Sequence, residues 1–233
     1  MSVKLAPGLA AVALALAAAP QAGAATLIVN GGFEDATGFV ADGVGGMWLG
    51  AGSTAIPGWT VIASDVTWFG PNPYGISGSG GSTRFLDLSG YTEGGPFGGV
   101  RQTVATAIGA TYRPTFDLGS HFMYGLPVEI RTTVGGVSQT FSSAVIAANA
   151  WEAKTYDFTA TSTSTVIDLV GMNRLNYIGL DNVALVRTSA EPDPKLPPGG
   201  GIPEPTVWAM LLMGFWAVGA AVRTQRRLPT RRY

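Results

Sequence analysis

Short stretches in which apolar and polar residues alternate recur along residues 58–187. In one of them Val128, Ile130 and Val134 occupy every second or fourth position, with polar residues between them. This period of two places apolar side chains on one face of a β-strand. Ten stretches are strand-like: 58–63, 66–69, 83–88, 99–104, 112–118, 128–134, 137–142, 151–159, 165–170 and 178–187. We therefore expect an all-β fold, an antiparallel β-sandwich of the jelly-roll type.

Glycine-rich segments separate these stretches. Gly135 and Gly136 lie between two strand-like runs and predict a two-residue hairpin. Residues 35–57, rich in Gly, Ala and Asp, are expected to form a long loop. Pro114 cannot donate a backbone hydrogen bond, so the strand that contains it is expected at a sheet edge or at a bulge.

The N-terminal segment differs from the rest of the chain. Lys4 precedes an apolar run over residues 5–19, and small residues of the A-x-A type follow at 22–24. These are the parts of a secretory signal peptide. We expect residues 1–24 to form a signal helix that is removed, and residues 25–188 to form one domain.

The C-terminal segment is also apolar, but it ends in positive charge. Residues 206–222 contain no charged residue, and the tail 223–233 carries five arginines. As a helix, residues 206–222 would be about 25 Å long, slightly short of the hydrocarbon core of about 30 Å. The arginines mark the cytoplasmic side of a predicted transmembrane helix, so the domain would face away from the cytoplasm. Residues 189–202, rich in Pro and Gly, are expected to be a linker.

Composition excludes several classes of function. The chain has no cysteine, which removes disulfides, thiolate metal sites and cysteine nucleophiles. Residues 26–188 contain 12 acidic and 7 basic residues, a net charge of −5. A mildly acidic domain without a basic patch is unsuited to nucleic acid, so no nucleic-acid partner is expected.

Pro203, Glu204 and Pro205, followed by the short apolar helix and the basic end, resemble the PEP-CTERM sorting signal. The resemblance implies a membrane-embedded exosortase as processing partner. The chain would be anchored transiently in the inner membrane, cut near the tripeptide, and left at the cell surface or in the extracellular matrix. A permanent single-span anchor is the alternative.

The domain resembles the galactose-binding-like jelly rolls, which include carbohydrate-binding modules. The motifs that carry this resemblance are 30–34 (NGGFE), 56–59 (IPGW), 86–88 (LDL), 101–104 (RQTV) and 179–183 (GLDNV). It implies a structural calcium ion bridging the first and last segments. Glu34, Asp181 and the backbone near Gly32 would be its ligands, and oxygen ligands of this kind suit calcium.

Aromatic and polar residues on predicted loops form a candidate sugar-binding cluster: Trp68, Asn72, Tyr74, Arg84, His121 and Tyr124. An aromatic ring can stack on a sugar, and polar side chains can fix its hydroxyl groups. The alternative is that Trp68 packs in the core and the others are solvated turn residues. Trp59 and Trp151, at strand starts, are expected to anchor the core.

Catalysis finds little support in the sequence. His121 is the only histidine, no serine lies in a G-x-S-x-G motif, and no spacing selects a pair of carboxylates. We expect a non-catalytic exported protein that associates with exopolysaccharide. The alternatives are a structural matrix protein that contacts other proteins and binds no sugar, and a polysaccharide hydrolase.

Overall fold

The computed structural model describes residues 25–90, 95–172, 177–189, 213 and 216. By its internal contacts the chain divides into a unit Met1–Ser189 and a unit Ala190–Tyr233. The predicted signal helix (1–24) and the sorting motif at Pro203, Glu204 and Pro205 lie outside the described residues. Among the described residues no helix is long and apolar enough to cross a membrane, and only Met213 and Trp216 of the predicted span are described.

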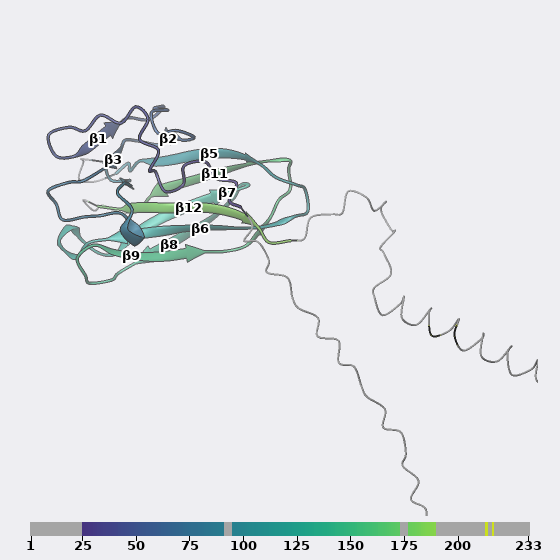
Figure 1. Cartoon of the computed structure of the whole chain (residues 1–233). Helices are drawn as coiled ribbons and strands as arrows, with labels where there is room; N and C mark the ends of the chain where they lie inside the picture. The colour runs from purple at the N-terminus through teal and green to yellow at the C-terminus, as the bar shows by residue number, and fades with distance from the viewer. Residues whose placement is uncertain (1–24, 91–94, 173–176, 190–212, 214–215, 217–233) are drawn as a thin grey trace, which may run out of the picture. The chain divides into compact units, whose positions relative to one another are not determined.

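The first unit is an antiparallel β-sandwich of two sheets, which confirms the expected fold class (Figure 1). One sheet has seven strands: β1 (Gly46–Leu49), β3 (Val66–Phe69), β4 (Phe85–Asp87), β12 (Gly179–Arg187), β6 (Thr111–Ser120), β9 (Ala150–Thr155) and β10 (Phe158–Thr159). The other has five: β2 (Thr60–Ile62), β5 (Gly99–Ala105), β11 (Ser164–Gly171), β7 (Val128–Val134) and β8 (Val137–Ser143). Two short 3₁₀ turns, η1 (Ser79–Gly81) and η2 (Phe122–Tyr124), are the helical elements of this unit's described part.

The alternation in sequence produces the sandwich directly. In β7 the apolar residues at 128, 130 and 134 are buried on the same face as Thr132, while Glu129, Arg131 and Thr133 on the other face are exposed or half-buried. The hairpin between β7 and β8 is also confirmed. Gly135 and Gly136 have φ of 57° and 86°, and Val134 pairs with Val137. Positive φ at both turn positions is what a two-residue type I′ turn requires.

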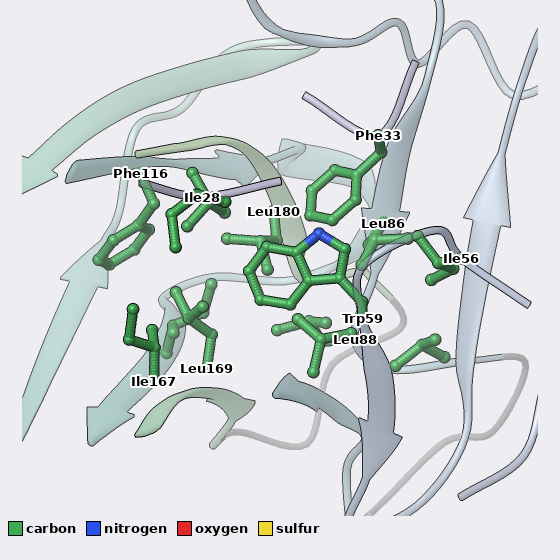
Figure 2. Packing of buried hydrophobic residues seen from close by; sticks show 14 of the residues in the cluster. Ile28, Phe33, Ile56, Trp59, Leu86, Leu88, Phe116, Ile167, Leu169 and Leu180 are labelled. Carbon is green, nitrogen blue, oxygen red and sulfur yellow. The ribbon is translucent and has the colours of Figure 1, made fainter. Parts of the chain in front are cut away.

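The inward faces of the two sheets form one apolar core, shown in part in Figure 2. Trp59 lies among Phe33, Leu86, Leu88 and neighbouring side chains and is 2% exposed. Its indole Nε1 donates a hydrogen bond to the carbonyl oxygen of Asn30 at 3.0 Å. The expectation that Trp59 anchors the core is confirmed, and its one polar atom is satisfied.

The first and last described segments of this unit lie side by side. The backbone N–H of Leu27 donates to Leu185 O at 2.8 Å, and that of Val183 donates to Gly31 O at 2.9 Å. The side-chain amide of Gln102, on β5, exchanges two hydrogen bonds with the backbone of Val29. The N-terminal segment is thus bonded to both sheets and closes one side of the core.

Two expectations about strands are corrected. Residues 35–57 are not a continuous loop, because they contain β1, which pairs with β3. Pro114 lies in β6, which is an interior strand. On one side it is paired with Leu185 of β12, and on the other it falls in the gap between β9 and β10, where no backbone N–H is needed.

Candidate functional site

The outer face of the seven-stranded sheet carries the two buried carboxylates of the described residues, Asp87 and Asp181. One row of directly paired residues crosses it from edge to edge: Trp48, Thr67, Asp87, Gly179, Gly119 and Trp151. Directly paired residues point to the same face of a sheet. In the neighbouring row, Phe69 pairs with Phe85, and Asp181 pairs with Asp117. An acidic and aromatic surface is therefore built by strand register.

Residues 70–84, here called the covering loop, lie over this face and are bonded to it along their length. Asn149 accepts from Ser77 N and donates to Ser77 Oγ, while Trp151 Nε1 donates to Ser77 O. Glu34 Oε1 accepts from Arg84 N at 2.7 Å. Within the loop, Gly78 permits a close approach to the segment 82–84, since a Cβ on Gly78 would lie 1.9 Å from Ser82 Oγ.

Asp181 and Asp117 hold the centre of the covering loop. Asp181 Oδ2 accepts from Ser79 N at 2.8 Å and from Ser82 Oγ at 2.5 Å, and Asp117 Oδ2 accepts from Ser79 Oγ at 2.6 Å. Burial raises the pKa of Asp181 to about 6. Ser79 therefore bonds both carboxylates, through its backbone N–H to Asp181 and through its hydroxyl to Asp117. The pair fixes the covering loop on the sheet.

The residues expected to bind calcium lie near one another. Asp181 is fully buried, Glu34 is exposed, and both bind the segment 82–84. Gly32 is close to Asn182, whose Oδ1 lies 3.6 Å from the position a Cβ would take at Gly32. Among the described residues there is no group of three or more His, Cys, Asp or Glu that could hold a metal. Each carboxylate also has protein donors of its own, so the donor set only partly fits an ion.

The predicted sugar-binding cluster does not form a single site. Trp68 is fully buried, and its Nε1 donates to Phe33 O at 3.1 Å. The guanidinium of Arg84 lies over Phe39, with its Cζ 3.9 Å from the ring centroid and 5.6 Å from that of Trp68. Asn72 bonds the backbone of its own loop at Gly70 and Ile76. These three residues have structural roles.

The remaining three predicted residues lie at a second aromatic cluster, which is formed by Phe69, Phe85 and Tyr177 with Tyr124 and Trp151 packed against it. His121 and Tyr124 are brought together, with ring centroids 4.8 Å apart, and His121 stacks on Phe122 at 5.3 Å. Tyr74 is elsewhere, packed edge-on against Phe69. A chain of ring contacts through Phe69, Phe85, Tyr177 and Tyr124 connects the two places.

Trp151 belongs to this second cluster and not to the main core, contrary to expectation. Its ring fills the space over Gly119, where an added Cβ would lie 2.7 Å from Cζ3. The phenol of Tyr177 lies over both Gly119 and Gly179. Its hydroxyl is buried without a hydrogen-bond partner among the described residues, and burial raises its pKa.

Trp48 was not among the binding residues predicted from the sequence. It is 56% exposed, more than any other aromatic side chain in the described part of this unit. Its Nε1 donates to Asp65 Oδ2 at 2.7 Å, and Asp65 Oδ1 accepts from Ser64 Oγ at 2.9 Å. The ring edge lies against Gly50, where a Cβ would be 3.5 Å from Cη2. Trp48, Asp65 and Ser64, here called the Trp48 platform, present an oriented ring next to a carboxylate. The sequence feature that could have indicated an exposed tryptophan here is the run 47–49 (Met-Trp-Leu), which lies between glycines.

Comparisons with known proteins give similarity in fold. No family model matches the chain, and no curated protein matches it. Among solved structures, it is similar to the CBM22 tandem domain of Paenibacillus barcinonensis Xyn10C, with 15% identity and a TM-score of 0.46 over 76% of this chain and 49% of that one. It is also similar to a family 35 carbohydrate-binding module from Clostridium thermocellum, with 15% identity and a TM-score of 0.41 over 62% of this chain and 99% of that one. At these TM-scores the similarity carries no argument about a ligand.

Proposed function

We propose that this protein is a non-catalytic, exported protein that associates with exopolysaccharide through its β-sandwich. The observation that carries the proposal is the Trp48 platform. Sugar-binding sites combine an aromatic surface with a few fixed polar groups. Trp48 is exposed, yet its ring is held by a short hydrogen bond to Asp65.

The platform offers both parts of such a site. The indole face can receive the apolar face of a pyranose ring, while Asp65 and Ser64 can bond hydroxyl groups at its edge. Because the hydrogen bond from Nε1 fixes the ring before binding, little side-chain entropy remains to be lost when a ligand binds. The exposed position of Trp48 near the border of the sheet also leaves room for a polymer that continues beyond the bound sugar.

Export and sorting are part of the same proposal. The signal peptide at 1–24, the PEP-CTERM tail at 203–233 and its exosortase partner would place the domain outside the inner membrane, at the cell surface or in the matrix. A calcium ion near Glu34 and Asp181, if held, would be structural. The sequence features given above support these steps, and separate experiments test calcium binding and sorting.

The test compares Trp48→Ala with Tyr74→Ala, which removes a second exposed aromatic (39%) from the covering loop. The full chain, in a detergent without a sugar head group, is run through gels that contain neutral or acidic polysaccharides. We expect retardation of the wild type and of Tyr74→Ala, and at least about a tenfold weaker affinity for Trp48→Ala. Because Trp48 is exposed and makes one side-chain hydrogen bond, its replacement should change stability by only about 1 kcal/mol.

Two outcomes would overturn the proposal. Absence of retardation of the wild type by every polysaccharide would remove sugar binding altogether. Equal retardation of the wild type and Trp48→Ala would remove the Trp48 platform as the site.

One observation favours the structural alternative, in which the domain contacts other proteins. Four exposed apolar side chains, here called the apolar tip, gather where η2 meets residues 145–147: Phe122, Met123, Val145 and Ile146. The backbone N–H of Phe122 bonds Ala147 O at 3.1 Å and holds the two segments together. Exposed apolar groups of this kind mark contact surfaces. Absence of retardation of the wild type by every polysaccharide, together with self-association or protein binding that Phe122→Ala removes, would favour this alternative.

A further inference from the structure

The two sheets have four edges, and three of them are protected against pairing with another strand. β2 has only three residues, and the backbone of Gly52 and Ser53 is bonded to Val61 along it. β1 has four residues, and Asp42 N bonds Gly46 O beside it. Short strands and covered edges are common devices against aggregation.

The third edge is formed by β9 and β10. β9 carries Glu152 and Lys154, whose charged groups lie 3.4 Å apart. β10 has only two residues and is preceded by Asp157, which pairs with Arg113 at 2.8 Å. Charged side chains on an edge oppose the approach of a second strand.

The fourth edge, β8, has none of these devices. It is seven residues long with the sequence VSQTFSS, which contains no charge, proline or glycine. Its first four residues and Ser142 are exposed, and among the described residues the strand pairs only with β7. A long, flat and uncharged edge is a template for another strand.

The hairpin register fixes which backbone groups of β8 face outward. A two-residue turn makes Val134 and Val137 a hydrogen-bonded pair, and such pairs then alternate along an antiparallel ladder. Val137, Gln139, Phe141 and Ser143 therefore bond to β7. The backbone N–H and C=O groups of Ser138, Thr140 and Ser142 point away from it.

These three outward residues are complementary to themselves. If a second copy approaches antiparallel with its Thr140 opposite Thr140, then Ser138 lies opposite Ser142 and the reverse. All three outward positions then meet outward positions, and about six backbone hydrogen bonds form. Hydroxyl side chains face one another across the strands, which is a favourable cross-strand pairing, and no like charges meet.

We propose that β8 is a self-association surface, through which two copies of this chain join their five-stranded sheets into one continuous sheet with a two-fold axis at Thr140. A two-fold axis gives a closed dimer and leaves no further β8 edge free. The contact involves one strand from each copy, so it is small beside the area of about 1,200 Å² or more in stable interfaces. The dimer is therefore weak in dilute solution. A larger fraction of the chains would dimerise when copies are confined to one surface or polymer, because their local concentration is then higher.

Cysteine crosslinking tests the geometry, because the chain has no cysteine of its own. Thr140→Cys is compared with Thr103→Cys, an exposed position of the same outer face on the interior strand β5. The full chain in detergent, with micelles in excess of protein, is treated with a short bis-maleimide. We expect covalent dimer from Thr140→Cys at several times the yield from Thr103→Cys. Equal yields would overturn the proposal.

Sedimentation velocity of Thr140→Lys and Thr103→Lys is a second test, which measures the strength of dimerisation. Two lysines would meet on the axis in the first variant, so its dimer dissociation constant should rise by about tenfold or more relative to the second. The same added charge at Thr103 controls for net charge. If the two variants associate equally, the edge is not the contact. Both readings are independent of polysaccharide binding, so they separate this proposal from the Trp48 platform.

Discussion

Asp87 gives a pH dependence opposite in sign to that of most carboxylates. Its side chain is 4% exposed on the outer face of the seven-stranded sheet, and burial raises its pKa from 3.8 to about 7. Donors lower the pKa in part, and all of them bond the same oxygen: Ile178 N, Ser89 N and Ser89 Oγ each donate to Oδ1, at 2.7 to 3.0 Å. The negative charge of nearby Asp65 raises the pKa of Asp87 further.

The sign follows from proton binding. Between about pH 4 and pH 7 the folded state holds a proton on Asp87 that the unfolded chain has released. The contribution of Asp87 to the free energy of unfolding therefore grows as the pH falls from about 8 toward 4. At about 1.4 kcal/mol for each pH unit, the full difference is about 4 kcal/mol.

The perturbation that isolates this effect is Asp87→Asn. The asparagine oxygen can take the place of Oδ1 and keep all three hydrogen bonds, and its amide nitrogen takes the place of the other oxygen. The variant thus imitates the protonated carboxyl at every pH. We expect it to be more stable than the wild type at pH 8, and the difference to shrink by about 3 kcal/mol between pH 8 and pH 5.

The assay is reversible urea unfolding of the full chain in detergent at several pH values, followed by tryptophan fluorescence. Asp157→Asn is the matched control, because the hydrogen bond from Arg113 lowers the pKa of Asp157 and its titration lies below this window. Its difference from the wild type should stay constant from pH 5 to pH 8. A stability difference for Asp87→Asn that is the same at pH 5 and pH 8 would refute the reasoning.

Two further predictions concern calcium and sorting. If Glu34 and Asp181 hold a structural calcium ion, EDTA should lower the melting temperature of the wild type but not that of Glu34→Gln; an unchanged melting curve for the wild type would count against the site. Replacing Pro203, Glu204 and Pro205 by alanine should leave the chain uncut in the inner membrane, measured by fractionation and mass; normal release of the variant would remove the sorting hypothesis.

The strands that could be predicted from the sequence are those with one face in the core and one face exposed to solvent. β5, β7 and β11 alternate in sequence because their outer faces are exposed, and their predicted and observed bounds differ by at most one residue at each end. β3 is buried on both faces, since the covering loop lies over Phe69. Its alternation is lost, and the sequence alone could not distinguish which of its side chains enter the core.

The site was harder to predict for the same reason. His121 and Tyr124 are three residues apart in a single turn, so local spacing sufficed to bring them together. Tyr74 and Arg84 depend on the path of the covering loop, which is set by carboxylates distant in sequence. Trp48 lies in a four-residue strand with glycine on either side, too short for a periodic signal.

The course of β12 has a consequence for how the domain is displayed. The strand begins at Gly179, in the row that contains Trp48, and runs the length of the sandwich to Arg187, close to where the chain leaves at Ser189 (Figure 1). Eight steps of about 3.3 Å separate the two ends by roughly 26 Å. Any attachment through the chain beyond residue 189 would therefore hold the domain at the end opposite to Gly179. In the proposed complex, a polysaccharide bound at Trp48 would therefore lie at the opposite end of β12 from Ser189.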